Sequence, residues 1–177
     1  MRDDSGRWPA FKAGLKTDIQ AEGVLVRHVA PVAQTLISGA RDAALSFAKT
    51  DSCVGWPDVA SGAIYAVSLR RDRILAVGLN AVETGWLEVP QLAVSDVSAG
   101  FQVIDLSGEM ALEVLKTGTE LSLGAPSGSA VRYWNGYEII LYRYTGERSF
   151  RLHISSPLFE GLWEMIQRQV RLVSDAP

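Results

Sequence analysis

The chain has 177 residues, of which 47% are apolar and 21% charged, a composition typical of a folded globular domain rather than a disordered segment. Its net charge is −3, which speaks against nucleic acid as a partner, because binding to a polyanion needs a clustered basic face. Cys53 is the only cysteine, so an internal disulfide is excluded.

Nothing in the sequence favours a membrane protein. No apolar stretch approaches the roughly 20 residues that cross a bilayer. The first five residues are charged or polar, with no apolar run behind them to form a signal peptide. We therefore expect a cytoplasmic protein without membrane contacts.

Residues 1–22 are expected to form a loosely held N-terminal arm, because they mix charges with glycines and show no sustained period. Trp8 and Phe11 stand out in this polar tail, and they suggest docking onto a surface of this chain or of a partner. Residues 23–177 are expected to form a single domain with two halves, about 23–93 and 94–177.

Each half begins with an apolar strand that runs through a Ser-Gly pair into a helix. In the first half, strand 32–37 leads through Ser38-Gly39 to a helix with an apolar face of Ala40, Ala44, Phe47 and Ala48. In the second half, strand 101–106 leads through Ser107-Gly108 to a helix faced by Ala111, Leu112 and Leu115. We expect both serines to cap their helices and Gly118 to end the second helix in the left-handed conformation.

A hairpin and a third strand follow each helix. The first hairpin joins 64–69 to 73–77 across Arg71-Asp72, and the second joins 130–134 to 137–143 across Asn135-Gly136. Asn-Gly is the strongest short-range hairpin signal, because both turn residues need a positive φ. The third strands are 86–89 and 150–154. The latter alternates apolar residues with Arg151 and His153, which is typical of a half-buried strand.

A last helix is expected from Ser156, with Pro157 in its first turn, where a missing N–H costs nothing. The whole pattern is a β-α-β-β-β unit used twice. It predicts an α+β protein, one pseudo-duplicated domain with helices packed on antiparallel sheets.

The residues that carry chemistry are scarce. Nucleophilic catalysis needs a base, usually histidine, and we expect His28 and His153 to be surface or interface residues. Cys53 has no basic neighbour in the sequence that would lower its pKa, which predicts a buried, inert thiol. One cysteine and two histidines do not complete a tetrahedral zinc site without carboxylates. We therefore predict no catalytic, cofactor-binding or metal-binding residue in this chain.

Aromatic residues and arginines gather around the second hairpin. Tyr, Trp and Arg are the residue types that anchor protein interfaces. The interface candidates are Trp134, Tyr142, Arg143 and Trp163. Core packing of the hairpin is the alternative, since strand alternation sends about half of these side chains inward.

The C-terminal half, from Val94 to about Ile166, resembles the gamma subunit of heterotetrameric sarcosine oxidase. The resemblance is carried by VSDVSAGF (94–101), VIDLSG (103–108), EVLKTG (113–118) and FRLHI (150–154). In the first half, Gly78-Leu79 and Trp86-Leu87 are similar to the family's Gly-Pro-x-x-Trp-Leu segment.

The resemblance implies a fold similar to a trimmed folate-binding aminomethyltransferase domain. It also implies a non-catalytic subunit of an oxidoreductase that demethylates sarcosine, or a related N-methyl amino acid, and passes the one-carbon unit to tetrahydrofolate. The partners would be alpha and beta subunits, with a delta subunit in some complexes. FAD, FMN, NAD, tetrahydrofolate and zinc are expected in those partners, and no cofactor in this chain.

A free-standing folate-binding or one-carbon transfer protein of the aminomethyltransferase type is the alternative. Such a protein would hold the pterin through a buried carboxylate, for which Asp96 and Asp105 are the candidates. An aspartate in an Asp-Val-Ser turn, however, is more often a capping residue than a ligand.

Overall fold

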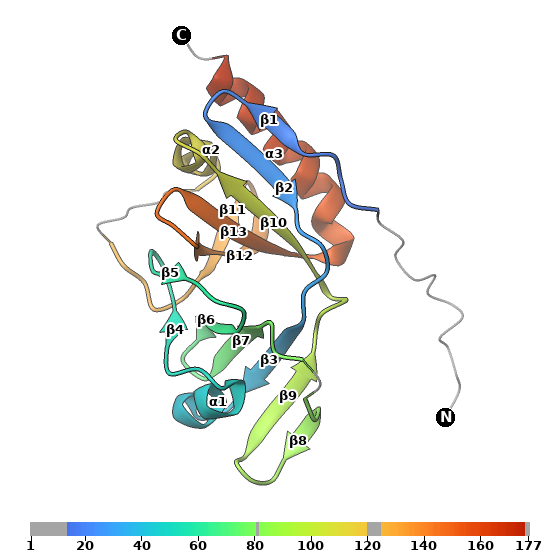
Figure 1. The fold of residues 1–177 in the computed structure, drawn as a ribbon, viewed down its shortest axis with the longest axis vertical. Helices are drawn as coiled ribbons and strands as arrows, with labels where there is room; N and C mark the ends of the chain where they lie inside the picture. The colour runs from blue at the N-terminus through green and yellow to red at the C-terminus, as the bar shows by residue number, and fades with distance from the viewer. Residues whose placement is uncertain (1–13, 81, 120–124, 176–177) are drawn as a thin grey trace.

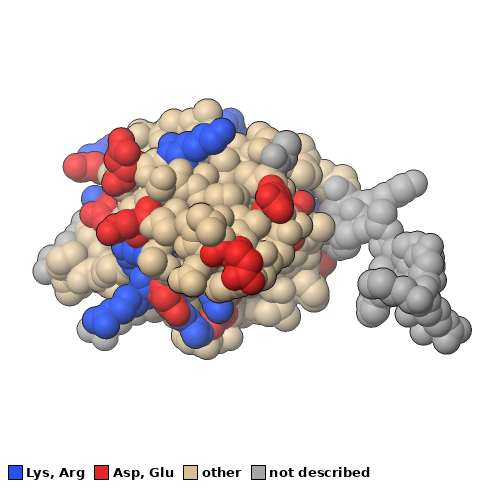
Figure 2. Space-filling model, turned by 90° about the horizontal axis from the view of Figure 1, so that it is seen from below, with Lys and Arg blue, Asp and Glu red and all other residues tan. Residues whose placement is uncertain are grey.

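The computed structural model describes residues 14–80, 82–119 and 125–175. Two β-sheets pack face to face, and helices cover their outer faces (Figure 1). The predicted α+β class is confirmed. Charged side chains of both signs are interspersed on the end of the molecule that Figure 2 views. Among the described residues, no helix combines the length and apolar character needed to span a membrane.

The six-stranded sheet belongs mainly to the first half of the chain. Its spatial order is β4 (Cys53–Val54), β6 (Tyr65–Arg70), β7 (Arg73–Val77), β3 (Gln34–Ser38), β9 (Leu92–Asp96) and β8 (Gly85–Leu87). All pairs are antiparallel except β4 with β6. Helix α1 (Arg41–Ala48) buries Ala44 and Ala48 against the outer face of this sheet.

The seven-stranded sheet belongs mainly to the second half. Its order is β1 (Ile19–Ala21), β2 (Val24–His28), β10 (Phe101–Ser107), β13 (Ser149–Ser155), β12 (Tyr137–Tyr144) and β11 (Val131–Trp134). Strand β5 (Val59–Ala60) adds to β12 in parallel. The outer face packs on α2 (Ala111–Lys116) and α3 (Phe159–Ser174), the latter preceded by a 3-10 turn over Ser156–Leu158.

The strand order repeats between the sheets, but the matching strands differ from the expected ones. The order β6-β7-β3-β9-β8 corresponds to β12-β13-β10-β2-β1. The predicted equivalence of 86–89 with 150–154 was therefore wrong: β7 is the counterpart of β13, and β8 lies at the opposite sheet edge. The hairpins are also exchanged relative to chain order: β1–β2 precedes β3 but pairs with β10, and β8–β9 precedes β10 but pairs with β3.

The N-terminal arm ends in ordered structure. Ile19–Ala21, inside the expected arm 1–22, forms β1 and pairs with β2. Trp8 and Phe11 lie outside the described residues.

The turn at Asn135-Gly136 has the predicted geometry, with φ of 47° and 86°. The predicted serine caps were wrong, because α1 and α2 have no side-chain capping hydrogen bond. Gly118 does follow the C-cap residue Thr117 of α2, but the predicted left-handed conformation was wrong, because its φ is not positive. A Cβ at Gly118 would lie 2.5 Å from Trp134 Nε1. The indole's approach, rather than a positive φ, explains the glycine.

Strand β13 is buried on both faces, so the half-buried prediction was wrong. Phe150, Leu152 and Ile154 face the helices as expected. Arg151 is 6% exposed and His153 is fully buried, because the six-stranded sheet covers the second face. The polar side chains of β13 therefore lie between the sheets.

Candidate functional site

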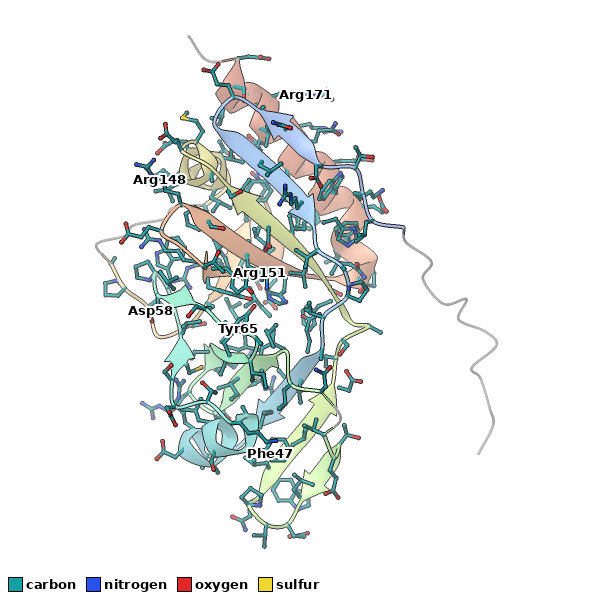
Figure 3. The ribbon with its side chains drawn as sticks, viewed as in Figure 1. Phe47, Asp58, Tyr65, Arg148, Arg151 and Arg171 are labelled. Atoms are coloured by element: carbon teal, nitrogen blue, oxygen red, sulfur yellow. The ribbon has the colours of Figure 1, made fainter. Side chains whose placement is uncertain are left out.

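A cluster of polar side chains lies between the two sheets, and strands from both supply it. Tyr65 comes from β6 and Gln34 from β3 of the six-stranded sheet; the seven-stranded sheet contributes Asp105, Tyr142, Arg151 and His153. Strand alternation aims these side chains inward, since their neighbours on each strand face the helices. Figure 3 shows Arg151 and Tyr65 approaching each other in this layer.

The hydrogen bonds of this cluster have one consistent direction. Gln34 Nε2 donates to the Phe101 carbonyl (3.3 Å), so Gln34 Oε1 is the acceptor for His153 Nδ1–H (2.6 Å). His153 Nε2 then accepts from the Tyr142 hydroxyl (2.7 Å). This leaves Tyr142 oxygen to accept from Tyr65 O–H (2.9 Å). The direction assigns His153 the Nδ1–H tautomer.

Arg151 continues the chain of bonds toward the outside. Its Nη1 donates to the Tyr65 oxygen (3.0 Å), while Nε and Nη2 each donate to one Asp105 oxygen at 2.7 Å. The guanidinium also stacks on Tyr144, 3.5 Å from its ring centroid. The bidentate pair therefore neutralises the Arg151 cation.

Burial sets the protonation states of the cluster. Desolvation, with a smaller contribution from the Arg151 charge, lowers the pKa of His153 to about 3. Burial likewise raises the pKa of Tyr65 and places that of Tyr142 well above its ordinary value. Burial opposes the charge on Arg151, but its hydrogen bonds to Asp105 and the neighbouring charges leave its pKa raised. The imidazole is thus neutral at physiological pH and a poor general base.

The cluster is suited to joining the sheets rather than to reacting. Both His153 nitrogens and both tyrosine hydroxyls are occupied by hydrogen bonds, and His153 and Tyr142 are fully buried. A cavity of about 220 Å³ touches His153 at the rim of the two sheets, alongside Leu36, Phe101 and Ile140. The charged residues of its lining are Arg70, Arg73 and Glu138.

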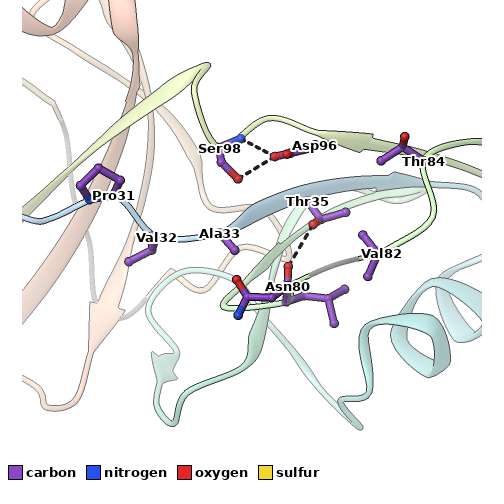
Figure 4. A pocket seen from close by; sticks show the side chains of 10 residues that line it. Pro31, Val32, Ala33, Thr35, Asn80, Val82, Thr84, Asp96 and Ser98 are labelled. Carbon is purple, nitrogen blue, oxygen red and sulfur yellow. Dashed lines mark hydrogen bonds between the residues drawn. The ribbon is translucent and has the colours of Figure 1, made fainter. Parts of the chain in front are cut away.

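A second pocket lies where the two connections between the sheets cross (Figure 4). Its volume is about 360 Å³, and Thr35, Asn80, Asp96 and Ser98 are among its lining residues. Asp96 Oδ1 accepts from Ser98 N–H (2.9 Å) and Ser98 O–H (2.6 Å). These bonds lower the pKa of the exposed Asp96. The capping role expected for this aspartate is therefore confirmed.

The four predicted interface residues lie mostly inside the chain. Trp134 is fully buried, and its indole Nε1 donates to the Leu115 carbonyl (2.7 Å). Tyr142 belongs to the inter-sheet cluster, and Trp163 is 7% exposed beside Phe159. Core packing therefore accounts for these three. Arg143 is half-buried, and its Nε has no hydrogen-bond partner; its interface role stays a prediction.

Both histidines were expected at a surface or interface, and the structure buries both in the chain. His28 is 7% exposed, hydrogen-bonded through Nε2 to Gln102 Oε1 (2.9 Å) and packed on Phe159. The sequence offers no sign of this burial, because the covering residues are distant in the chain.

Cys53 is partly rather than fully buried. Burial raises its pKa to about 11, against smaller effects of the Arg41 charge and of a hydrogen bond with Ser68. A basic residue is thus near the thiol in space, contrary to expectation, but burial outweighs it. Within the described ranges, no three His, Cys, Asp or Glu side chains are grouped as metal ligands.

The comparisons with known proteins bear on the fold. No protein-family profile matches the chain, and a search of curated proteins gives no match. A chain of the heterotetrameric sarcosine oxidase from Corynebacterium sp. U-96, solved with pyrrole 2-carboxylate, superposes with a TM-score of 0.66. The match covers 90% of this chain and 89% of that one, at 17% identity.

The chain has the fold of this sarcosine oxidase chain. The resemblance found on residues of the C-terminal half is thereby confirmed for the fold, over nearly the whole of both chains. The aminomethyltransferase T of the Bartonella henselae glycine cleavage system is also similar, with a TM-score of 0.48 and 14% identity. That match covers 81% of this chain but only 45% of the transferase.

Proposed function

We propose that this chain is the non-catalytic gamma subunit of a heteromeric sarcosine oxidase-type flavoenzyme. The carrying observation is the fold shared end to end with a chain of a heterotetrameric oxidase, since 90% and 89% of the two chains superpose. The proposed complex oxidatively demethylates sarcosine or a related N-methyl amino acid, in the cytoplasm. Alpha, beta and in some cases delta subunits are its partners, and they hold the FAD, FMN, NAD, tetrahydrofolate and zinc.

The inter-sheet cluster supports a structural role. Its acid-base groups are occupied by one another, and its histidine is held neutral by burial. Such a cluster fixes the relative position of two sheets without offering a reactive atom to a substrate. A subunit of this kind acts by presenting a rigid surface to the catalytic subunits.

The folate-binding alternative has less support from the two carboxylates that would serve it. Asp105 accepts hydrogen bonds from Arg151 at both oxygens, and Asp96 is exposed and accepts two hydrogen bonds from Ser98. A pterin would have to displace these bonds to be held by either residue. Neither candidate thus presents a free, buried acceptor.

Co-expression tests the proposal. The flavoprotein subunits encoded by neighbouring open reading frames are produced with this chain and without it. We expect a flavin-containing complex that includes this chain, and a sharp loss of assembled, active oxidase when it is left out. Stable, fully active flavoprotein without this chain would overturn the proposal.

A second experiment distinguishes the proposed function from the folate-binding alternative. Isolated chain is titrated with tetrahydrofolate and with its 5-formyl derivative by calorimetry. We expect no binding at micromolar concentration. Micromolar binding that is abolished by Asp105→Asn would favour the folate-binding protein instead.

A further inference from the structure

The six-stranded sheet is covered on its inner face at one end and bare at the other. Over β6 and β7 this face is packed against the seven-stranded sheet, and Val67 and Leu75 are fully buried. The register shows that Trp86 of β8 and Ala93 of β9 lie on the same face: Leu75 is opposite Leu36, Leu36 opposite Ser95, and Ala93 opposite Trp86. Here, however, the side chains are exposed.

The hairpin of β8 and β9 extends beyond the seven-stranded sheet (Figure 1). Its other face is buried, because Leu92 and Val94 pack in the cluster under α1. On the bare face Trp86 is 58% exposed, and Val89 at the turn is 91% exposed. An exposed tryptophan on a β-hairpin is the kind of residue that anchors protein interfaces.

Strand β8 is also the edge of its sheet. It pairs only with β9, and no other backbone hydrogen bond of Gly85–Leu87 to a described residue occurs. An open edge offers N–H and C=O groups to an added strand. Backbone pairing and the Trp86 side chain are therefore available to the same polypeptide.

The charge carried by this hairpin itself has one sign. From Arg73 to Lys116 the sequence contains no Lys or Arg between the two, while Glu83, Glu88 and Asp96 are exposed on or beside the ribbon. Glu83 and Glu88 make no ion pair with a described residue. Figure 2 shows acidic side chains within an uncharged area on this end of the molecule.

The first cation along this row of the sheet is distant and engaged. Trp86, Ala93, Ser38 and Arg73 lie side by side across four strands. Arg73 Nε donates to Ser38 Oγ at 3.0 Å, three strands away from Trp86. The hairpin thus combines apolar anchors, an open backbone edge and an uncompensated negative charge.

We propose that the β8–β9 hairpin is the surface by which this chain docks onto a flavoprotein subunit of its complex. The occupant is an extended segment with apolar side chains flanked by Lys or Arg, which pairs with the edge of β8 and packs on Trp86. This deepens the proposed function and rests on it. A second copy of this chain fits less well, because two acidic hairpins would repel each other.

Co-expression with the neighbouring flavoprotein subunits tests the surface. Trp86→Ser is expected to reduce incorporation of this chain into the complex by about tenfold or more. The matched control is Tyr133→Ser, which removes an aromatic that is 64% exposed on β11, at the edge of the other sheet. Circular dichroism and the melting temperature of each isolated variant show whether it folds.

A charge variant keeps the test independent of Trp86. Glu83→Gln with Glu88→Gln is expected to weaken assembly several-fold and to flatten its dependence on salt concentration. If wild-type chain assembles and both hairpin variants assemble as well, the docking surface is wrong and the proposed function stands. If the wild-type chain does not assemble, both are overturned.

Photo-cross-linking identifies the occupant. Benzoylphenylalanine at position 89 is expected to form an adduct with an apolar, Lys- or Arg-flanked segment of a flavoprotein subunit. An adduct with a second copy of this chain, or an acidic target segment, would overturn the proposal.

Discussion

At the scale of single residues, the Arg151–Asp105 ion pair is the interaction most sensitive to substitution. Arg151 is 7% exposed in its side chain, whereas Asp105 is 26% exposed and reaches water. Removing one partner of a buried pair is costly because the other charge remains desolvated. The two single substitutions should therefore differ, since the stranded charge is deeper in one case.

Asp105→Ala is expected to lower the free energy of unfolding by about 3 kcal/mol, because it leaves the Arg151 guanidinium uncompensated. Arg151→Met should cost less, and the double variant should be more stable than the sum of both losses implies. Urea denaturation of the three variants measures this. Asp18→Ala, which breaks the exposed pair with Arg27, serves as control and should cost under about 0.5 kcal/mol. Additive losses would contradict the coupling.

The Cys53 thiol gives a second prediction at this scale. With its pKa raised to about 11 by burial, very little thiolate exists at pH 8. Alkylation by iodoacetamide at that pH is expected to be about tenfold or more slower than for free cysteine. The unfolded chain in urea supplies the control and should react at the rate of the free amino acid. A rate in the folded protein equal to the control would contradict the raised pKa.

At the scale of elements, local turn chemistry was predictable and the covering of faces was not. Asn135-Gly136 identifies its turn because the backbone itself demands those residues. Alternation along 150–154 shows which side chains of β13 share a face, but it cannot show that a second sheet lies on the polar one. His153 and Arg151 were therefore placed at the surface, and the cluster with Tyr65 and Gln34 was missed.

The glycine turns between strand and helix show the same division. The Ser-Gly pairs were recognised, but the serines do not cap the helices as predicted, and it is the glycines that the backbone requires. Gly39 and Gly108 have φ of 145° and 118°, and each is in close contact with a distant backbone atom. Such close approaches are set by tertiary packing, so the local sequence around the glycine does not predict them.

Gly108→Ala is expected to destabilise the protein by about 2 kcal/mol or more, because the added Cβ would lie 2.2 Å from the Gly23 carbonyl oxygen and φ is positive. Gly128→Ala is the matched control: no atom of a described residue lies within 4 Å of its Cβ position, so the stability of this variant should change by under about 1 kcal/mol. Thermal unfolding of the two variants compares them. Equal melting temperatures would show that the turn tolerates a side chain.

At the scale of the whole molecule, the two halves are interleaved rather than stacked. Strand β2 directly precedes β3 in the chain but joins the sheet of β10, and β9 directly precedes β10 but joins the sheet of β3. The polar cluster lies between these sheets and ties β3 and β6 to β10, β12 and β13. The sequence repeat does not reveal this exchange, because its pattern is the same whether each hairpin pairs within the sheet of the strand that follows it or within the other sheet.

The buried His153 makes the stability of the packing between the two sheets sensitive to acid. Its pKa falls from an ordinary 6.5 to about 3 on folding, so between these values the unfolded chain binds a proton that the folded one does not. The stability linked to His153 is therefore complete above pH 6.5 and is lost as pH falls toward 3. From pH 7 to pH 5 the loss is expected to be about 2 kcal/mol. Urea denaturation at both values measures it.

His153→Gln supplies the comparison, because a glutamine keeps polar atoms in the layer but does not titrate. All carboxylates remain in this variant, so its own change between pH 7 and pH 5 reports everything except the histidine. The variant is expected to be less stable than the wild type at pH 7, yet to lose about 2 kcal/mol less on acidification. If both proteins lost the same free energy of unfolding between pH 7 and pH 5, the imidazole would not be held neutral between the sheets. The acid sensitivity would then come from other groups.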